Sequence, residues 1–170
     1  MKSNVALISG LTALALIIPA PSAFAGQKQE SGSFDGAYVK REVQPIAEGH
    51  ILMLDEATGT NKGGGRLDGF SVSCREIADL DKGNGPHSGY CLFAEGSDEQ
   101  TVKFNGKVAT EMKDGHPNTR MAGNWVVVSA AGTLTGSHGE GTYSGYFTAE
   151  DKYHIDWKGR LEGPAAMASK

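Results

Sequence analysis

Short apolar segments alternate with clusters of Gly, Asn and Asp along the chain from His50 onward. Within these segments apolar and polar side chains alternate, as in Phe70, Val72 and Cys74, which occupy every second position. Strand-length segments at this spacing, bounded by turn residues, are typical of a β-sandwich or a β-barrel. No segment after the first 25 residues has the 3.6-residue periodicity of an amphipathic helix. The sequence therefore predicts an all-β protein.

The pattern predicts about eight strands. A first segment, 34–43, is expected either as a short strand or as a stretch lying across the end of a barrel. The other predicted strands are 50–56, 66–77, 87–94, 101–112, 120–129, 141–149 and 152–162. The chain has 24 glycines, and glycine in strands marks bulges and close approaches at barrel corners. We therefore expect a single antiparallel barrel, whose interior is either filled by side chains or holds one small ligand.

The first 25 residues have the anatomy of a secretory signal peptide. Lys2 gives a positive start, 5–18 is an apolar run, and Ala23-Phe24-Ala25 is a site for signal peptidase. The alternative is a membrane anchor, but that needs about 20 apolar residues, and this run is shorter. We expect cleavage, a periplasmic or secreted location, and no insertion of the mature chain into a membrane.

The remaining chain divides into a polar leader (26–48) that is expected to be disordered, a barrel domain (49–163) and a flexible tail (164–170). Removing the signal leaves 15 basic against 20 acidic side chains. Such a mildly acidic protein has no electrostatic reason to bind nucleic acid or anionic membranes. Association into homo-oligomers is left open by the sequence.

Two cysteines, Cys74 and Cys91, are predicted to form a disulfide, because an even pair in an exported protein favours one. The alternatives are two free thiols or half of a metal site, although neither cysteine has a second ligand at metal-site spacing. If 66–77 and 87–94 form an antiparallel hairpin, residues whose numbers add up to about 165 face each other, and the two cysteines do so. Opposed residues in a non-hydrogen-bonded pair are close enough for a disulfide.

A further group of motifs resembles a family of small exported bacterial proteins. These motifs are Cys74 with Gly89-Tyr90-Cys91, then Gly132-Thr133-Leu134-Thr135-Gly136, then Gly139-Glu140-Gly141-Thr142-Tyr143. The family resembles calycin-like barrels of the allene oxide cyclase type, and the resemblance covers about 66–163. It implies a barrel fold, and suggests a cyclase or isomerase as one function for such a barrel.

The aromatic residues are the strongest functional candidates. Period two places Tyr153, Ile155 and Trp157 on one face of the last predicted strand, and Tyr143 and Phe147 on one face of the preceding strand. These rings could line a pocket for a flat or apolar small molecule, or could simply fill the barrel. The predicted ligand-binding residues are Phe70, Trp125, Tyr143, Phe147, Tyr153 and Trp157.

Candidates for catalysis are fewer. His50 opens a strand in which Leu52 and Leu54 are expected to face inward, and Glu140 lies between two glycines at a strand entrance. With Tyr143 and Tyr153 they form the candidate catalytic set. The five histidines have no metal-site spacing, and His87 and His116 are expected in exposed loops beside prolines. No metal and no cofactor are predicted.

Two functions follow from these observations. The favoured one is an exported barrel that binds a small apolar or aromatic molecule. The alternative is a cofactor-free enzyme of the cyclase or isomerase kind, which needs at least two polar groups converging on a pocket.

Overall fold

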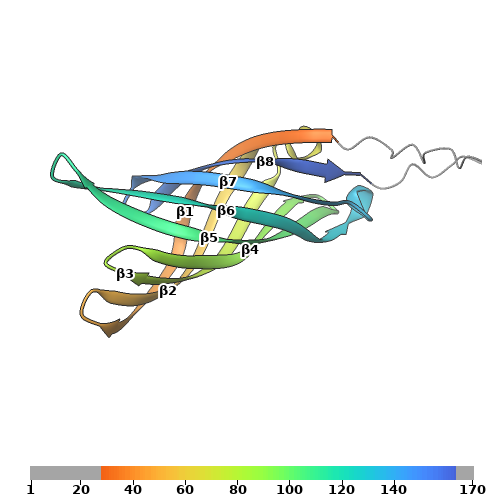
Figure 1. The fold of residues 1–170 in the computed structure, drawn as a ribbon. Coiled ribbons are helices and arrows are strands. Elements are labelled where there is room, and N and C mark those ends of the chain that lie inside the picture. Colours follow the sequence, from red (N-terminus) through yellow and green to blue (C-terminus); the bar gives the residue numbers. More distant parts are fainter. Residues whose placement is uncertain (1–27, 164–170) are drawn as a thin grey trace, which may run out of the picture.

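The computed structural model describes residues 28–163, which form one closed antiparallel barrel of eight strands (Figure 1). The predicted signal peptide (1–25) and the predicted tail (164–170) lie outside the described residues. The strands are β1 (Lys28–Ala47), β2 (His50–Gly63), β3 (Ser71–Asp81), β4 (Gly85–Glu95), β5 (Asp98–Lys113), β6 (His116–Ala131), β7 (His138–Ala149) and β8 (Lys152–Glu162). The predicted all-β fold and barrel are confirmed.

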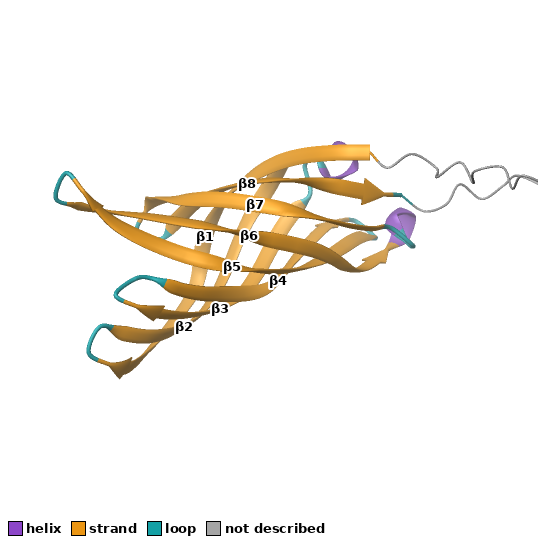
Figure 2. Ribbon diagram, viewed as in Figure 1, coloured by secondary structure: helices purple, strands orange, loops and turns teal. Residues whose placement is uncertain are grey.

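Each strand pairs with the next one along the chain, and β1 pairs with β8 to close the barrel. The start of β1 and the end of β8 therefore lie side by side at one end (Figure 1). Two short 3₁₀ turns, η1 (Gly65–Leu67) and η2 (Gly132–Leu134), lie at this same end (Figure 2). They carry the buried residues Leu67 and Leu134, which cover this end of the interior. We call it the closed end.

β1 is much longer than predicted, and it covers most of the region that the sequence pattern assigned to a disordered polar leader. Phe34, Gly36 and Tyr38 occupy every second position, and the three face the interior next to β8. The backbone of the segment pairs with β8 from Lys28 to Ala37 and with β2 over most of the strand. Backbone pairing on both sides holds a segment that has few apolar side chains of its own.

The β3–β4 hairpin confirms the predicted cysteine register. Cys74 and Cys91 are direct partners, their Cα atoms are 4.1 Å apart, and they form a disulfide. The turn is shorter than the predicted loop, because Lys82 and Gly83 adopt positive φ values and reverse the chain within three residues. β3 also begins at Ser71 rather than at 66, where η1 lies.

β2 faces the opposite way from the prediction. Leu54 is 46% exposed on the outer face, whereas Ile51 and Met53 face inward and pack on a cluster formed by Ala78, Leu80 and Val108. In β2 the odd-numbered positions carry Ile51 and Met53 and the even-numbered positions carry Leu52 and Leu54. A shift of one residue exchanges the two faces of a strand. The pattern alone therefore allowed either orientation.

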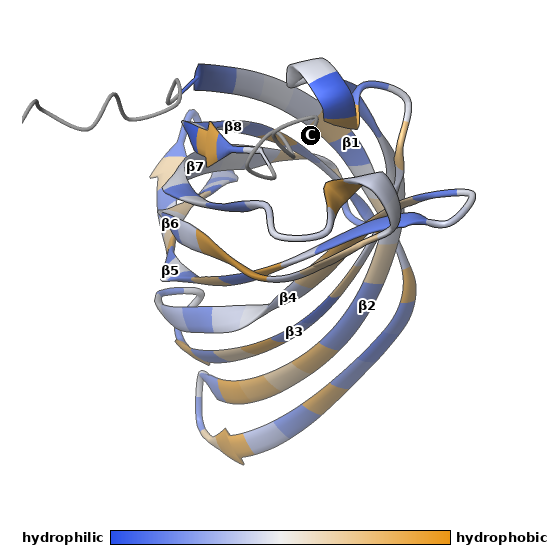
Figure 3. Cartoon of the chain, turned by 90° about the vertical axis from the view of Figure 1, so that its right-hand side faces the viewer, coloured by the Kyte–Doolittle hydropathy of each residue, from blue (hydrophilic) through white to orange (hydrophobic). Residues whose placement is uncertain are grey.

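The opposite end of the barrel, which we call the hairpin end, is wider. β1 pairs with β8 only as far as Ala37, and β6 pairs with β7 only from Arg120 onward. The β1–β2 and β5–β6 hairpins consequently extend past these pairings as two arms (Figure 1). Viewed from the closed end, the strands ring the interior and carry alternating apolar and polar bands (Figure 3).

Candidate functional site

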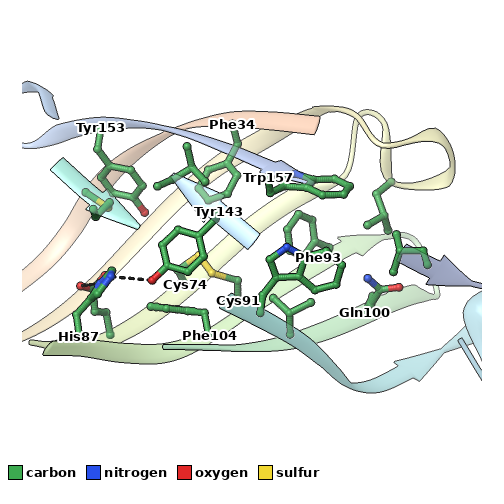
Figure 4. Close-up of a pocket in the computed structure, with 17 residues that line it drawn as sticks. Phe34, Cys74, His87, Cys91, Phe93, Gln100, Phe104, Tyr143, Tyr153 and Trp157 are labelled. Atoms are coloured by element: carbon green, nitrogen blue, oxygen red, sulfur yellow. Dashed lines mark hydrogen bonds and ion pairs between the residues drawn. A yellow bond between two sulfur atoms is a disulfide. The ribbon is translucent and has the colours of Figure 1, made fainter. Parts of the chain in front are cut away.

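The interior of the barrel holds the main apolar core and a cavity of about 70 Å³ (Figure 4). Aromatic rings form a large part of the lining, with Phe34, Phe93 and Trp157 above and beside the disulfide. A volume of this size holds a few water-sized groups, whereas pockets for drug-sized ligands measure about 300–1,000 Å³. The rings therefore fill most of the barrel, and the remaining space is narrower than the pocket the sequence suggested.

A chain of hydrogen bonds enters this cavity from β3, β4 and β7. Nδ1 of His87 lies 2.7 Å from Oε1 of Glu76, and Nε2 of His87 lies 2.7 Å from the hydroxyl of Tyr143 (Figure 4). All three side chains line the cavity, and the His87 side chain is only 1% exposed. We call Glu76, His87 and Tyr143 the polar triad.

The partners of His87 define its proton arrangement. A carboxylate can only accept, so the bond to Glu76 assigns the ring proton of His87 to Nδ1. Nε2 then accepts the hydrogen bond that the Tyr143 hydroxyl donates. Burial raises the pKa of Tyr143 well above its usual range, and the charge of Glu76 raises it further. Tyr143 therefore keeps its proton, and its oxygen lone pairs remain available to a donor in the cavity.

Paired glycines make room for Tyr143. Gly106 on β5 and Gly123 on β6 are direct partners, and a Cβ at these positions would lie 2.4 Å and 2.7 Å from the Tyr143 hydroxyl oxygen. Real Cβ atoms do not come so close to an oxygen, so any larger residue would displace the phenol. Glycine at these two positions is what allows the hydroxyl to reach His87.

Tyr153 supplies a second phenol to the cavity from β8. Its hydroxyl points toward the region of the polar triad (Figure 4) and makes no hydrogen bond to any residue from 28 to 163. Burial raises the pKa of Tyr153 well above its usual range, and the charge of Glu76 raises it further. The site thus offers one free phenol donor beside the hydrogen-bonded triad.

The two indole N–H groups, by contrast, are already used. Nε1 of Trp157 donates to Oδ1 of Asn61 at 2.8 Å, and Nε1 of Trp125 donates to the Thr142 carbonyl at 3.2 Å. The two rings meet edge to face with centroids 6.0 Å apart. They therefore supply apolar surface rather than hydrogen bonds to the cavity.

An ion pair lies between the cavity and the hairpin end. Asp55 is 4% exposed and accepts from Nε of Arg41 at 3.3 Å, and the guanidinium lies 4.0 Å from the centre of the Tyr38 ring. Burial raises the pKa of Asp55 to about 6, Arg41 opposes this rise and Glu76 adds to it. Arg41 also donates to the carbonyl of Glu150 at 3.3 Å, so it joins the β1–β2 arm to the β7–β8 turn.

The structure separates the predicted ligand-binding residues into two groups. Trp125, Tyr143, Tyr153 and Trp157 line the cavity. The other two do not line it. Phe70 is buried in the core, and Phe147 packs against Tyr38 and Tyr153 farther toward the hairpin end.

Two of the four predicted catalytic candidates lie away from the cavity. His50 faces outward at the start of β2, where it contacts Asp79, and Glu140 is exposed on the outer face of β7. Tyr143 and Tyr153 both reach the cavity, so two polar groups of the predicted set do converge.

Three polar residues of the cavity were not among the predicted site residues. His87 was expected in an exposed loop because it follows Pro86, but it is 3% exposed on β4. The cysteine register contained the signal for it, since His87 lies an even number of residues from Cys91, as Glu76 does from Cys74. Gln100 is equally in phase with the inward-facing residues Val102 and Phe104 of β5.

No cluster of three or more potential metal ligands occurs among residues 28–163. Within the same part of the chain, none of the helices has the length and hydropathy needed to cross a bilayer.

The cavity with its polar triad is thus the candidate functional site of the barrel. No protein-family model matches the chain, and no curated protein matches it either.

Proposed function

We propose that this protein binds a small molecule inside its barrel, with the apolar part among the aromatic rings and one polar group at Tyr143 and Tyr153. The observation that carries the proposal is the polar triad, which places a buried histidine and a partly exposed carboxylate on the wall of a mainly apolar cavity. Apolar side chains of similar volume could fill the same space without a loss of stability, because the hydrogen bonds within such a triad have to offset the cost of removing its polar groups from water.

The size of the cavity limits the ligand. A dry cavity of about 150 Å³ accepts benzene, which is twice the volume available here. The ligand is therefore a molecule of a few non-hydrogen atoms, or a single ring for which lining side chains move. Met121 is the lining residue best suited to move, because its unbranched side chain has three rotatable bonds.

Phenol is a suitable probe, since its hydroxyl can donate to Tyr143 and its ring matches the lining. We expect phenol to shift the indole N–H resonances of Trp125 and Trp157 in two-dimensional NMR spectra. Met121→Ala enlarges the cavity and should tighten phenol binding, whereas Val102→Phe fills it and should abolish binding. Val126→Phe, on the outer face of β6, is the matched control and should bind as the wild type does. Equal binding by the Val102→Phe variant would contradict an internal site.

A second function is supported by the same triad, namely proton transfer in a cofactor-free isomerase. Tyr153 would donate a hydrogen bond to a substrate carbonyl oxygen, while the C–H bond beside the carbonyl breaks. That proton passes to the Tyr143 oxygen as the Tyr143 proton moves to Nε2 of His87. The result is an enolate held by Tyr153, and an imidazolium paired with Glu76.

This step can be tested with cyclopentanone, a ketone of one small ring, in D₂O. An isomerase should accelerate exchange of the α-hydrogens, measured by proton NMR, and His87→Gln should remove the acceleration. Tyr146→Phe changes an exposed phenol on the same strand as Tyr143 and should leave the rate unchanged. Binding of the ketone without accelerated exchange would contradict the isomerase function, and only the binding function would remain.

The disulfide is typical of proteins that fold in an oxidising compartment. Together with the predicted signal peptide it supports our further proposal that the mature protein works in the periplasm or outside the cell. The barrel form also agrees with the expected likeness to calycin-like barrels of the allene oxide cyclase type, which stays part of the proposal.

A further inference from the structure

Gln100 places a carboxamide at the far side of the cavity from the polar triad (Figure 4). It lies on β5 close to the closed end, pairs with Phe93 across the β4–β5 ladder, and is 2% exposed. Along β5, Gln100 is six positions from Gly106, where the Tyr143 hydroxyl lies. The cavity therefore has a polar group near each end.

The Gln100 carboxamide is unpartnered. Neither its oxygen nor its nitrogen makes a hydrogen bond to any residue in the described range of 28–163. Neither atom is among the fully shielded unpaired atoms of this range, so the carboxamide keeps contact with open space. Taking a polar group out of bulk water without giving it a protein partner costs free energy. An apolar side chain of similar length would avoid that cost, so stability alone gives no reason for an amide at this position.

Asn61 provides the contrast within the same barrel. This residue is also fully buried, but its nitrogen donates to the carbonyls of Gly63 and Leu67, and its oxygen accepts from Trp157. Asn61 therefore holds the loop of η1 in place and has nothing left to offer a ligand. Gln100 keeps both its donor and its acceptor free of protein partners, and its side chain lines the cavity.

The charges around the cavity restrict the group that could pair with Gln100. Among the described residues that line it, Glu76 is the only carboxylate and none is Lys or Arg. A ligand anion would have no counter-ion and would lie in one low-dielectric space with Glu76. A neutral group with adjacent donor and acceptor atoms, in contrast, can form two hydrogen bonds with a carboxamide.

We propose that the ligand is a neutral molecule with an amide or lactam group, which pairs with Gln100 through two hydrogen bonds while its apolar part lies against Phe93 and Trp157. This inference rests on the proposed binding function and specifies its ligand class.

Three probes of one shape test this ligand class: benzamide, benzoate and cumene, which share a phenyl ring with a three-atom branched group. We expect benzamide to bind at least tenfold more tightly than the other two, and to shift the side-chain NH₂ resonances of Gln100. Gln100→Met should reduce benzamide affinity about tenfold and leave cumene affinity unchanged. Gln29→Met, at an exposed position of β1, is the matched control and should bind all probes as the wild type does.

Thermal unfolding of the same variants gives a measurement that needs no ligand. Gln100→Met should be at least as stable as the wild type, because it removes an unpaired buried amide. A clear loss of stability would overturn the inference, since the amide would then have a structural partner. Benzamide binding that is unchanged in Gln100→Met, or tighter binding of benzoate, would overturn it as well. If no probe shifts the Trp125 and Trp157 indole resonances, the proposal of an internal binding site is itself wrong. Binding that does not depend on Gln100 would contradict only the proposed ligand class, so the two failures can be distinguished.

Discussion

The hydroxyl of Tyr143 lies 2.7 Å from Nε2 of His87, although 56 residues separate the two along the chain. β7 brings the phenol across the barrel from β4, and His87 is fixed from its other side by Glu76. The Glu76–His87 bond lies within the β3–β4 hairpin, but the bond to Tyr143 joins β4 to β7, so the complete polar triad forms only when these strands come together in the barrel.

Tyr143→Phe should destabilise the protein by about 1–3 kcal/mol, because it leaves Nε2 of His87 buried without a partner. Unfolding in urea, followed by tryptophan fluorescence, measures this change. Tyr146→Phe removes a phenol from the exposed face of the same strand and should alter stability by no more than about 0.5 kcal/mol. Equal effects of the two substitutions would show that the His87 bond contributes nothing to stability.

Asp55 should make the protein less stable as the pH rises from about 4 to about 6. Its pKa is raised from the usual 3.8 to about 6, so the folded state binds this proton more tightly than the unfolded chain does. The contribution is present below the unfolded pKa and is lost as the pH rises through the folded pKa. Its size is of the order of 3 kcal/mol, at 1.36 kcal/mol for each pKa unit.

The measurement compares the pH dependence of urea unfolding in wild type and Asp55→Asn. The stability of the variant relative to wild type should increase over this pH range and then level off. Asp151→Asn, at an exposed position in the β7–β8 turn, should give a constant difference instead. A difference that is also constant for Asp55→Asn would contradict the raised pKa.

Reduction of the disulfide should cost about 3 kcal/mol, because Cys74 and Cys91 are 17 residues apart and their bond restricts the unfolded chain. Dithiothreitol should lower the urea midpoint of the wild type. The double variant Cys74→Ala/Cys91→Ala should start from a lower midpoint and not respond to the reductant. The prediction fails if the wild type keeps its midpoint after thiol titration has confirmed reduction.

His154 should titrate above its usual pKa of 6.5, chiefly because its Nδ1 lies 2.7 Å from the carboxylate of Asp35. The same contact lowers the pKa of Asp35. The stabilising effect of the charged His154 is therefore present at low pH and is lost as the pH rises through the folded pKa. NMR titration should show the midpoint moving down in Asp35→Asn and staying in place in Asp114→Asn, which changes an exposed turn.

The sequence was sufficient to predict the fold class and one strand register. Alternation with period two and frequent turn residues indicated a barrel, and the cysteine pair fixed how β3 meets β4. The orientation of β2 could not be predicted, because Ile51 and Met53 compete with Leu52 and Leu54 for the inner face. β1 was not predicted at its full length because most of its hydrogen bonds come from the backbone, which leaves little trace in side-chain pattern.

The candidate site was predictable in its aromatic part, which includes the phenols of Tyr143 and Tyr153. Rings at alternating positions indicated Trp125 and Trp157, since an aromatic residue in phase with a core is expected to be buried. His87 was not recognised in the same way, because a histidine beside a proline is usually exposed. The cysteine register could have placed His87 and Glu76 on the inner face, but their hydrogen bonds to each other and to Tyr143 depend on contacts between strands that the local sequence does not show.

The pairing of β1 with β8 has a consequence for how the chain folds. The other seven pairings join neighbours in the sequence, but this one brings Ala37 to Lys152, so the entropy of a very long loop opposes it. We expect it to form last, after an open sheet of eight strands. Until then Phe34 is separated from Tyr153, the interior is wet, and both outer strands present unpaired edges on which other chains can add. The step that encloses the cavity is thus also the one at which the folding chain is most open to aggregation.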